Sequence, residues 1–325
     1  MEPVVDKAEL LLQAQMLGFE RVRIIPPLPF RHWREQVAGV SDGRVQGLEW
    51  DPLSLLPGAK SLIILAMPYT PYAGRPDEVY LHPYYPASNA AHAGCLQLGQ
   101  WLNGQGFKTL AAPPLPHKSS AARAKLGRYG RNGLISIPPF GTRVCLQLLL
   151  SEAPLAFDAF DEGEEMPLDT ACEGCGLCKT LCPTGALDGS GRLEIGRCLR
   201  GVLTAQPVPE VYRALMGNSL MGCDLCQARC PRNPSMDERE MPQDLRQALD
   251  LRALLTGQVK PLWPFLGKNN ARPARTQAQA ALIAANLNRR DLIPLIEPLT
   301  GHFMPLVKEH ALWALNRLTE RANRN

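Results

Sequence analysis

The spacing of the cysteines constrains this chain more than any other feature of its sequence. Eight of its ten cysteines lie between residues 172 and 230. One run reads Cys172-x2-Cys175-x2-Cys178-x3-Cys182-Pro183, and a later run reads Cys223-x2-Cys226-x3-Cys230-Pro231. The segment around them is rich in Gly and Pro and poor in long apolar runs. It cannot bury much core by itself, so bonds to the cysteines must hold it together.

The first run has the spacing of bacterial ferredoxins, in which three cysteines hold one iron–sulfur cube and the fourth binds a second cube. The second run lacks one cysteine, which Cys198 can supply. Eight thiols suffice for two [4Fe–4S] clusters. We assign one set of four as Cys172, Cys175, Cys178 and Cys230, and the other as Cys182, Cys198, Cys223 and Cys226. Zinc also binds paired Cys-x2-Cys motifs, but it requires neither the third cysteine at the same spacing nor a Cys-Pro in both runs.

The remaining features favour a protein of the reducing cytoplasm. The first twenty residues lack the basic flank, apolar core and cleavage site of a signal peptide, and no run of about 18 apolar residues predicts a membrane span. Cys95 and Cys145 lie in apolar contexts and are interpreted as buried structural residues. The net charge of +4 does not by itself indicate nucleic-acid binding.

The chain divides into three predicted regions. Residues 1–165 alternate helical and strand patterns, with helices over 7–17 and 89–106 and strands over 22–25, 61–67 and 144–150, and predict an α/β domain. Residues 166–240 form the predicted ferredoxin-like double-cluster module. Residues 241–325 predict an all-α domain, with helices over 273–287, 291–298 and 304–322. It has the size of one or two helical-repeat units and should pack on the preceding regions.

Two stretches of the first region could carry chemistry. Gly127, Gly130 and Gly133 recur every three residues, so their backbone N–H groups could face a polar cofactor; an ordinary Gly-rich connection is an equal alternative. Tyr84 and Tyr85 precede a predicted helix and could donate protons, although aromatic residues in a Pro-rich loop more often simply pack.

Taken together, several segments resemble the epoxyqueuosine reductases and their relatives, the corrinoid-dependent reductive dehalogenases. The segments are LGFERVRI, PGAKSLIILAMPY, AARAKLGRYGRNGLISIPPFGTRV, GRCLRGVLT, GCDLCQARCPRNP and LVKEHALWALNRL. The resemblance implies base-off cobalamin in the N-terminal domain, beside one cluster, and a HEAT-like helical tail. It further implies reduction of epoxyqueuosine to queuosine in tRNA, with electrons from a flavodoxin- or ferredoxin-type donor. Residues matching the enclosure of the corrinoid are Gly127, Tyr129, Gly130, Asn132, Gly133 and Gly141.

One departure from the family pattern concerns the proton donor. The Asp-Tyr-His motif of the family is not evident, since the corresponding stretch reads HPYYPASNAAH. The Trp-Ile-Gly-Lys stretch reads Arg128-Tyr129-Gly130-Arg131, which is closer to the dehalogenase-like branch. In that branch a tyrosine and a basic residue act together, so Tyr84 or Tyr85 with Arg131 could fill these roles. The departure bears on the substrate more than on the redox machinery.

The C-terminal region is basic and could bind tRNA phosphates, although the charge alone slightly favours an ordinary solvated face. The basic residues are Arg272, Arg275, Arg289, Arg290, Lys308, Arg317, Arg321 and Arg324. Three hypotheses therefore remain: a reductase of epoxyqueuosine in tRNA, a related corrinoid reductase of another substrate, and a non-enzymatic double-cluster electron carrier.

Overall fold

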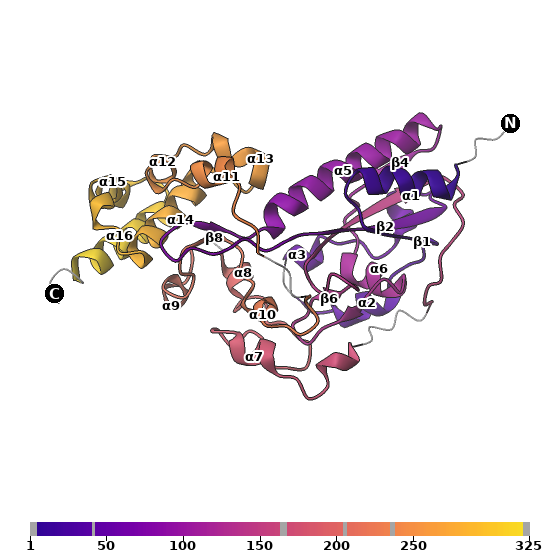
Figure 1. Ribbon diagram of the computed structural model, residues 1–325, viewed down its shortest axis with the longest axis horizontal. Helices are drawn as coiled ribbons and strands as arrows, with labels where there is room; N and C mark the ends of the chain where they lie inside the picture. The colour runs from indigo at the N-terminus through magenta and orange to yellow at the C-terminus, as the bar shows by residue number, and fades with distance from the viewer. Residues whose placement is uncertain (1–4, 41–42, 163–167, 204–206, 235–237, 321–325) are drawn as a thin grey trace.

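The computed structural model describes residues 5–40, 43–162, 168–203, 207–234 and 238–320. The predicted boundary between residues 165 and 166 lies outside these ranges, as do Arg321 and Arg324. The described part is elongated, with the N-terminal sheet domain at one end and the C-terminal helices at the other (Figure 1).

A four-stranded antiparallel sheet forms the centre of the N-terminal region. Its order is β1 (Arg21–Ile25), β2 (Ser61–Pro68), β7 (Val144–Ser151) and β4 (Thr109–Ala111). The continuous apolar run of β2 reflects burial on both faces: Ile63 and Leu65 face one hydrophobic cluster, and Leu62 and Ile64 face another. The predicted strands over 22–25, 61–67 and 144–150 are confirmed.

Helices cover both faces of this sheet. α1 (Lys7–Met16) and α5 (Tyr84–Gly104) pack on one face, while α2 (Arg31–Gln36) and α6 (His117–Arg123) pack on the other. Two short helices, α3 (Gly43–Gln46) and α4 (Pro52–Leu55), lie in the connection from α2 to β2.

Helix α5 begins five residues before the predicted start. Pro83 occupies its N-cap position and Pro86 lies in the first turn, where the missing proline N–H breaks no helical hydrogen bond. Tyr84 and Tyr85 therefore lie in the first helical turn and not in a loop. Just before them, β3 (Tyr80–Leu81) pairs in parallel with β8 (Ser219–Met221), which joins this segment to the cysteine-rich module.

The cysteine-rich module consists of short elements. A hairpin of β5 (Arg128–Tyr129) and β6 (Ile135–Ser136) precedes it. The module itself contains η1 (Thr170–Cys172), α7 (Leu177–Leu181), α8 (Leu199–Val202), α9 (Glu210–Arg213) and α10 (Leu225–Ala228). Helices α7 and α10 pack against each other, and α7 lies at the edge of the molecule (Figure 1).

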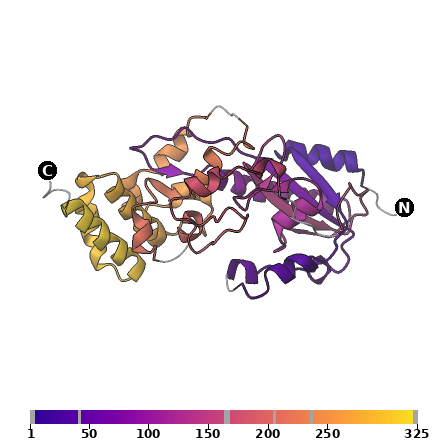
Figure 2. The same cartoon turned by 90° about the horizontal axis from the view of Figure 1, so that it is seen from below.

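The C-terminal region is helical, as predicted. Its elements are α11 (Gln243–Ala248), α12 (Leu251–Leu255), η2 (Lys260–Leu262), α13 (Trp263–Leu266), α14 (Pro273–Asn286), η3 (Arg290–Leu292), α15 (Ile293–Ile296), η4 (Glu297–Gly301) and α16 (Pro305–Glu320). The long helices α14 and α16 pack side by side (Figure 2). Whether this arrangement is HEAT-like stays a prediction.

One hydrophobic cluster joins the helical region to the rest of the chain. It combines Leu81 and Val202 with the buried faces of α14 and α16. A buried polar contact accompanies it: Nε2 of His310, on α16, accepts a hydrogen bond from the Val208 N–H at 3.0 Å. The C-terminal helices thus pack on the preceding regions, as expected. Over the described residues, the structure contains no helix long and apolar enough to cross a bilayer.

Candidate functional site

The eight cysteines line two separate cavities. Cys182, Cys198, Cys223 and Cys226 line one, and Cys172, Cys175, Cys178 and Cys230 line the other. These are the two sets of four that the spacing predicts. We call the first the cleft-side cavity, because it adjoins the cleft described below, and the second the far cavity. The assignment of each thiol to a particular cluster stays a prediction.

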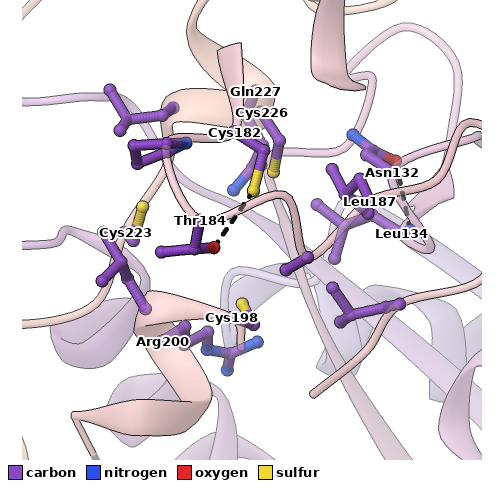
Figure 3. Close-up of a pocket in the computed structure, with 15 residues that line it drawn as sticks. Asn132, Leu134, Cys182, Thr184, Leu187, Cys198, Arg200, Cys223, Cys226 and Gln227 are labelled. Atoms are coloured by element: carbon purple, nitrogen blue, oxygen red, sulfur yellow. Dashed lines mark hydrogen bonds between the residues drawn. The ribbon is translucent and has the colours of Figure 1, made fainter. Parts of the chain in front are cut away.

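The four thiols of the cleft-side cavity come from three separate segments of the chain (Figure 3). Cys182 follows α7, Cys198 caps α8, and Cys223 and Cys226 flank the start of α10. The buried hydroxyl of Thr184 lies 3.4 Å from the Cys182 sulfur. When a metal converts this thiol to thiolate, the hydroxyl is the donor, and such hydrogen bonds tune clusters.

The far cavity is enclosed by the η1–α7 loop and the end of α10. Gly174, at φ +68°, makes the tight turn between Cys172 and Cys175. The buried Asp169 carboxylate lies 2.7 Å from Arg232 Nε, and it also accepts a hydrogen bond from the Ala171 N–H at 3.0 Å. These contacts hold the start of the loop that carries Cys172.

The thiols surround space and do not converge on a point. Among the described residues, no group of three or more His, Cys, Asp or Glu side chains is placed to hold one metal ion. Four thiols around a cavity are the donor set that a multi-iron cube requires. The residues present therefore fit two [4Fe–4S] clusters.

An open cleft of about 480 Å³ lies next to the cleft-side cavity. Leu134, Leu193 and Arg200 line both. The cleft has an aliphatic part and a polar part, with lining residues Tyr84, Ser88, His117, Lys118, Gly133, Leu134, Ile135, Thr142, Val144, Leu146, Gln147, Leu193, Ile195 and Arg200. None of these lining side chains, all from the described ranges, is a carboxylate.

Arg200 links the cluster ligands to two tyrosines. Its guanidinium carbon lies 4.4 Å from the Tyr84 ring centroid, and the Tyr84 and Tyr85 rings meet edge to face at 5.6 Å. Burial raises the pKa of Tyr85, while Arg200 opposes this shift. Arg200 follows the predicted ligand Cys198 by two residues. The cation therefore touches the cluster loop, the tyrosines and the cleft.

His82 forms a second link between the cluster loop and Tyr84. It is buried, its Nδ1 accepts a hydrogen bond from the Tyr84 N–H at 3.1 Å, and its Nε2 lies 3.5 Å from the Asp224 carboxylate. Asp224 directly follows Cys223. A Cβ on Gly222 would meet the His82 Cβ at 2.5 Å, so only glycine permits this approach.

Two further basic residues, His117 and Lys118, lie in the cleft at the start of α6. Lys118 Nζ donates to the Gly133 carbonyl at 2.6 Å and lies 5.9 Å from the Tyr129 ring. Burial lowers the pKa of Lys118, and nearby Arg200 acts in the same direction. Burial also lowers the pKa of His117, although its hydrogen bond with the Leu115 carbonyl opposes this. Burial raises the pKa of Tyr129 to about 12.

The residues that sequence analysis predicted as one catalytic and cofactor site line different cavities in the structure. Tyr84 and Gly133 line the cleft, and Tyr85 lies behind Tyr84 in an adjoining pocket. Arg131 and Gly130 line the far cavity, and Asn132 lies between the two cavities. Their catalytic and cofactor roles stay predictions.

The other positions of the predicted corrinoid enclosure make close contacts within the protein, and their cofactor role stays a prediction. A Cβ on Gly127 would lie 2.4 Å from the Ser136 carbonyl, and one on Gly141 would lie 2.3 Å from Asn233 Oδ1. The Tyr129 hydroxyl lies 3.3 Å from that of Ser119. Cys95 and Cys145 are buried, as expected.

Sequence reasoning missed Arg200, His82, His117 and Lys118. A signal for Arg200 was present in GRCLR, because a cation two residues after a cluster ligand must lie near the cluster. Nothing local identifies His82 or the pair at 117–118, which reach the site only through the fold.

Comparisons with known proteins agree with this geometry. Residues 171–233 match the model of a 4Fe-4S double cluster binding domain. Proteins named epoxyqueuosine reductase from Bacillus cereus and Staphylococcus aureus are 25% and 27% identical to the chain; each match covers 96% of this chain and 89% and 88% of the relative. A crystal structure of epoxyqueuosine reductase with an epoxyqueuosine-modified tRNA-Tyr stem loop superposes with a TM-score of 0.78, at 22% identity, over 97% of this chain and 91% of that one. This last likeness shows a shared fold.

Proposed function

Because the chain is a relative of the epoxyqueuosine reductase family along nearly its whole length, we propose that this oxidoreductase reduces epoxyqueuosine to queuosine in tRNA. The observation that carries the proposal is the contact between a predicted cluster-binding loop and a cleft lined by Tyr84, Lys118 and Arg200. An electron source and proton donors thus meet at one open site.

The double-cluster domain would deliver electrons in a defined order. The cleft-side cavity shares three lining residues with the cleft, and Cys223 lines the pocket that holds Tyr84 and Tyr85. No cysteine of the far cavity lines the cleft or this pocket. The far cluster would therefore receive electrons from a flavodoxin- or ferredoxin-type donor, and the cleft-side cluster would pass them on.

The lining of the cleft supports the proposal that part of a cobalamin binds there. Its aliphatic part, formed by Ile135, Val144, Leu146 and Ile195, suits the apolar face of a corrin ring, and its polar part offers partners to peripheral amides. When bound there, cobalamin supplies the strongly reducing centre that cleavage of an epoxide C–O bond requires. Gly133 and Lys118 would line its edge.

The proton would come from this chain's own side chains. The Tyr84 phenol is an O–H donor that faces the cleft. Arg200 holds its ring and stabilises negative charge that develops on the phenol oxygen, while His82 fixes the backbone from which the phenol projects. Tyr84 would donate to the oxygen released from the epoxide, with Tyr85 in support.

The C-terminal helices would contact the tRNA, as the basic side chains exposed there suggest. Arg272 and Lys308 are exposed, and a relative of this fold has been crystallised with a tRNA stem loop. Part of the positive charge is already neutralised, because Asp291 lies 2.8 Å from Arg289 and 2.7 Å from Arg252. We also propose that the chain divides into three parts at 1–165, 166–240 and 241–325 and that the last part is HEAT-like. From the sequence features described above, we further propose a cytoplasmic location.

One observation favours a second candidate function. The described cleft lining contains no carboxylate, in keeping with the missing Asp-Tyr-His motif. A related reduction of another substrate, using the same clusters and Tyr84, is consistent with this lining.

The first experiment is cobalamin binding by the full chain, purified and reconstituted with clusters under anaerobic conditions. We expect the visible spectrum of added cobalamin to change to the base-off form. If cobalamin does not bind while the clusters are intact, both reductase proposals fail and an electron carrier remains.

Turnover then separates the two candidate functions. We expect conversion of epoxyqueuosine to queuosine in a tRNA anticodon stem loop when the holoprotein is supplied with a low-potential reductant. Cobalamin binding without conversion of this substrate would favour the second candidate.

A further inference from the structure

A serine in the far cavity has a buried hydroxyl without a partner. Ser136 is 2% exposed and lines this cavity together with Cys172, Cys175, Cys178 and Cys230. Among the residues that the structure describes, its Oγ has no hydrogen-bond partner. A buried hydroxyl left unpaired loses its hydrogen bonds to water without replacement, so it requires an explanation.

Its surroundings prevent this serine from moving away. Ser136 ends strand β6, where it pairs with Arg128 of β5. Gly127, the residue before β5, approaches so closely that an added Cβ would lie 2.4 Å from the Ser136 carbonyl oxygen. The hairpin therefore fixes the backbone, and rotation about one side-chain bond is the only freedom left to the hydroxyl.

The geometry points to a role for this hydroxyl as a hydrogen-bond donor to a sulfur of the cluster held in the far cavity, where it raises the reduction potential of that cluster. This inference rests on the proposed cluster assignment. Reduction adds one electron, whose charge spreads over the cluster sulfurs. A donor aimed at a sulfur stabilises the reduced form more than the oxidised form, and hydrogen bonds of this kind are among the determinants of cluster potentials.

The cleft-side cavity contains a comparable contact already formed. There the Thr184 hydroxyl lies 3.4 Å from the Cys182 sulfur. Thr142 also lines the far cavity, but its buried hydroxyl is already hydrogen-bonded to Gln227 and Asn233 at 3.0 Å. The hydroxyl available to each cluster is therefore that of Ser136, on the hairpin, or that of Thr184, within the module. The far cluster depends on a residue outside its own domain, which links its potential to correct docking of the hairpin.

The test is Ser136→Ala in the full chain with both clusters reconstituted, studied by redox titration monitored by electron paramagnetic resonance. Because one hydrogen bond to the cluster is lost, we expect the equilibrium constant for one-electron reduction of one cluster to fall about three- to tenfold. This is a lowering of about 28–59 mV at 59 mV per tenfold change.

Two further variants identify the cluster and exclude general effects. Thr184→Val should lower the potential of the other cluster and leave the one affected by Ser136→Ala unchanged. Ser120→Ala removes an equally buried hydroxyl that already donates to the Pro116 carbonyl at 2.9 Å, and it should change neither potential.

The outcomes separate this inference from the proposed function. Unchanged potentials in Ser136→Ala, with full iron content, would overturn the inference alone. If Ser136→Ala and Thr184→Val both shifted the reduction potential of the same cluster, the assignment of the two hydroxyls to different cavities would be overturned. A wild-type chain that binds no clusters would overturn the proposed function itself.

Discussion

The two cysteine cavities differ in what surrounds them more than in their ligands. The cleft-side cavity is bordered by Leu134 and Arg200, which also line the cleft, and Cys223 adjoins the tyrosine pocket. The far cavity is bordered by Arg131, Arg232 and the exposed Leu177. Similar cysteine spacings therefore occur in different surroundings, and of the two cavities the cleft-side cavity is the one that shares lining residues with the cleft.

The two cavities are also attached to the protein differently. The segment after Cys198 continues into a core shared with the C-terminal helices, through Val202 and the hydrogen bond between Val208 and His310. The far cavity depends on the β5–β6 hairpin and on the Asp169–Arg232 ion pair. Damage to the C-terminal helices should therefore affect the cleft-side cavity first.

The largest expected effect comes from removing one predicted ligand from each cavity, which distinguishes the roles of the two clusters. Cys226→Ala should lower iron from about eight to about four atoms per chain and abolish turnover with any reductant. Cys230→Ala should lose the same amount of iron yet keep turnover with a small-molecule reductant, which can reach the cleft-side cluster directly. Iron analysis measures the loss of a cluster in each variant, and turnover with dithionite measures the activity that remains.

Cys95→Ala is the matched control for these variants. Cys95 is buried, and its thiol lies 3.3 Å from the Leu148 carbonyl, outside both cavities. Iron content should stay at the wild-type value. Equal loss of dithionite-driven turnover in Cys226→Ala and Cys230→Ala would contradict the proposed electron order.

The next effect concerns the cation between the cleft-side cavity and the tyrosines. Arg200→Gln should lower kcat about ten- to a hundredfold, because hydrogen bonds to charged groups contribute about 1.5–3 kcal/mol. Iron content should remain unchanged, which separates this loss from damage to the cluster. Steady-state turnover with saturating reductant is the measurement.

Arg131→Gln is the variant to compare with Arg200→Gln. Sequence analysis predicted Arg131 as the basic partner of the tyrosines, whereas in the structure it lines the far cavity. A larger loss of kcat in Arg131→Gln than in Arg200→Gln would restore the sequence-based interpretation.

The contrast between Arg131 and Arg200 shows what the sequence could and could not predict. Bond geometry ties cysteine spacing directly to ligand sets, so spacing predicts two sets of four, and the structure places each set around its own cavity. Strands such as β2 were found because burial on both faces leaves a continuous apolar run. The cleft was not found from the sequence, because it combines residues of α5, α6 and α8. No local pattern reports which elements meet. The start of α5 was missed for a local reason: prolines signal a loop, yet they also fit a first helical turn.

A smaller effect concerns the attachment of the cleft-side region to the C-terminal helices. Burial lowers the pKa of His310 to about 4, and Arg213 acts in the same direction. The folded state thus keeps His310 neutral, whereas the unfolded chain protonates it near pH 6.5. Its contribution to stability is present above pH 6.5 and is lost as the pH falls toward 4. Between pH 6.5 and 5 the free energy of unfolding should fall by about 2 kcal/mol from this group.

Chemical unfolding of the holoprotein under anaerobic conditions, at pH 7.5, 6.5 and 5, measures this slope. His310→Gln should be less stable at pH 7.5 but should lack this part of the pH dependence. His302→Gln is the control, because His302 lies in the loop before α16; it should keep the wild-type slope. A wild-type slope in His310→Gln would contradict the assignment.

The smallest effect tests the attachment of the far cavity. Asp169→Asn keeps the side-chain shape but removes the charge that faces Arg232 at 2.7 Å. Because the Arg232 side chain is 36% exposed, solvent screens the pair, and the loss in unfolding free energy should be only about 1 kcal/mol. The variant should also release the iron of the far cluster to a chelator faster than the iron of the cleft-side cluster. Asp291→Asn, in an exposed pair with Arg289, is the matched control and should release iron at the wild-type rate. Equal acceleration at both clusters in Asp169→Asn would mean that the two cavities are not held independently.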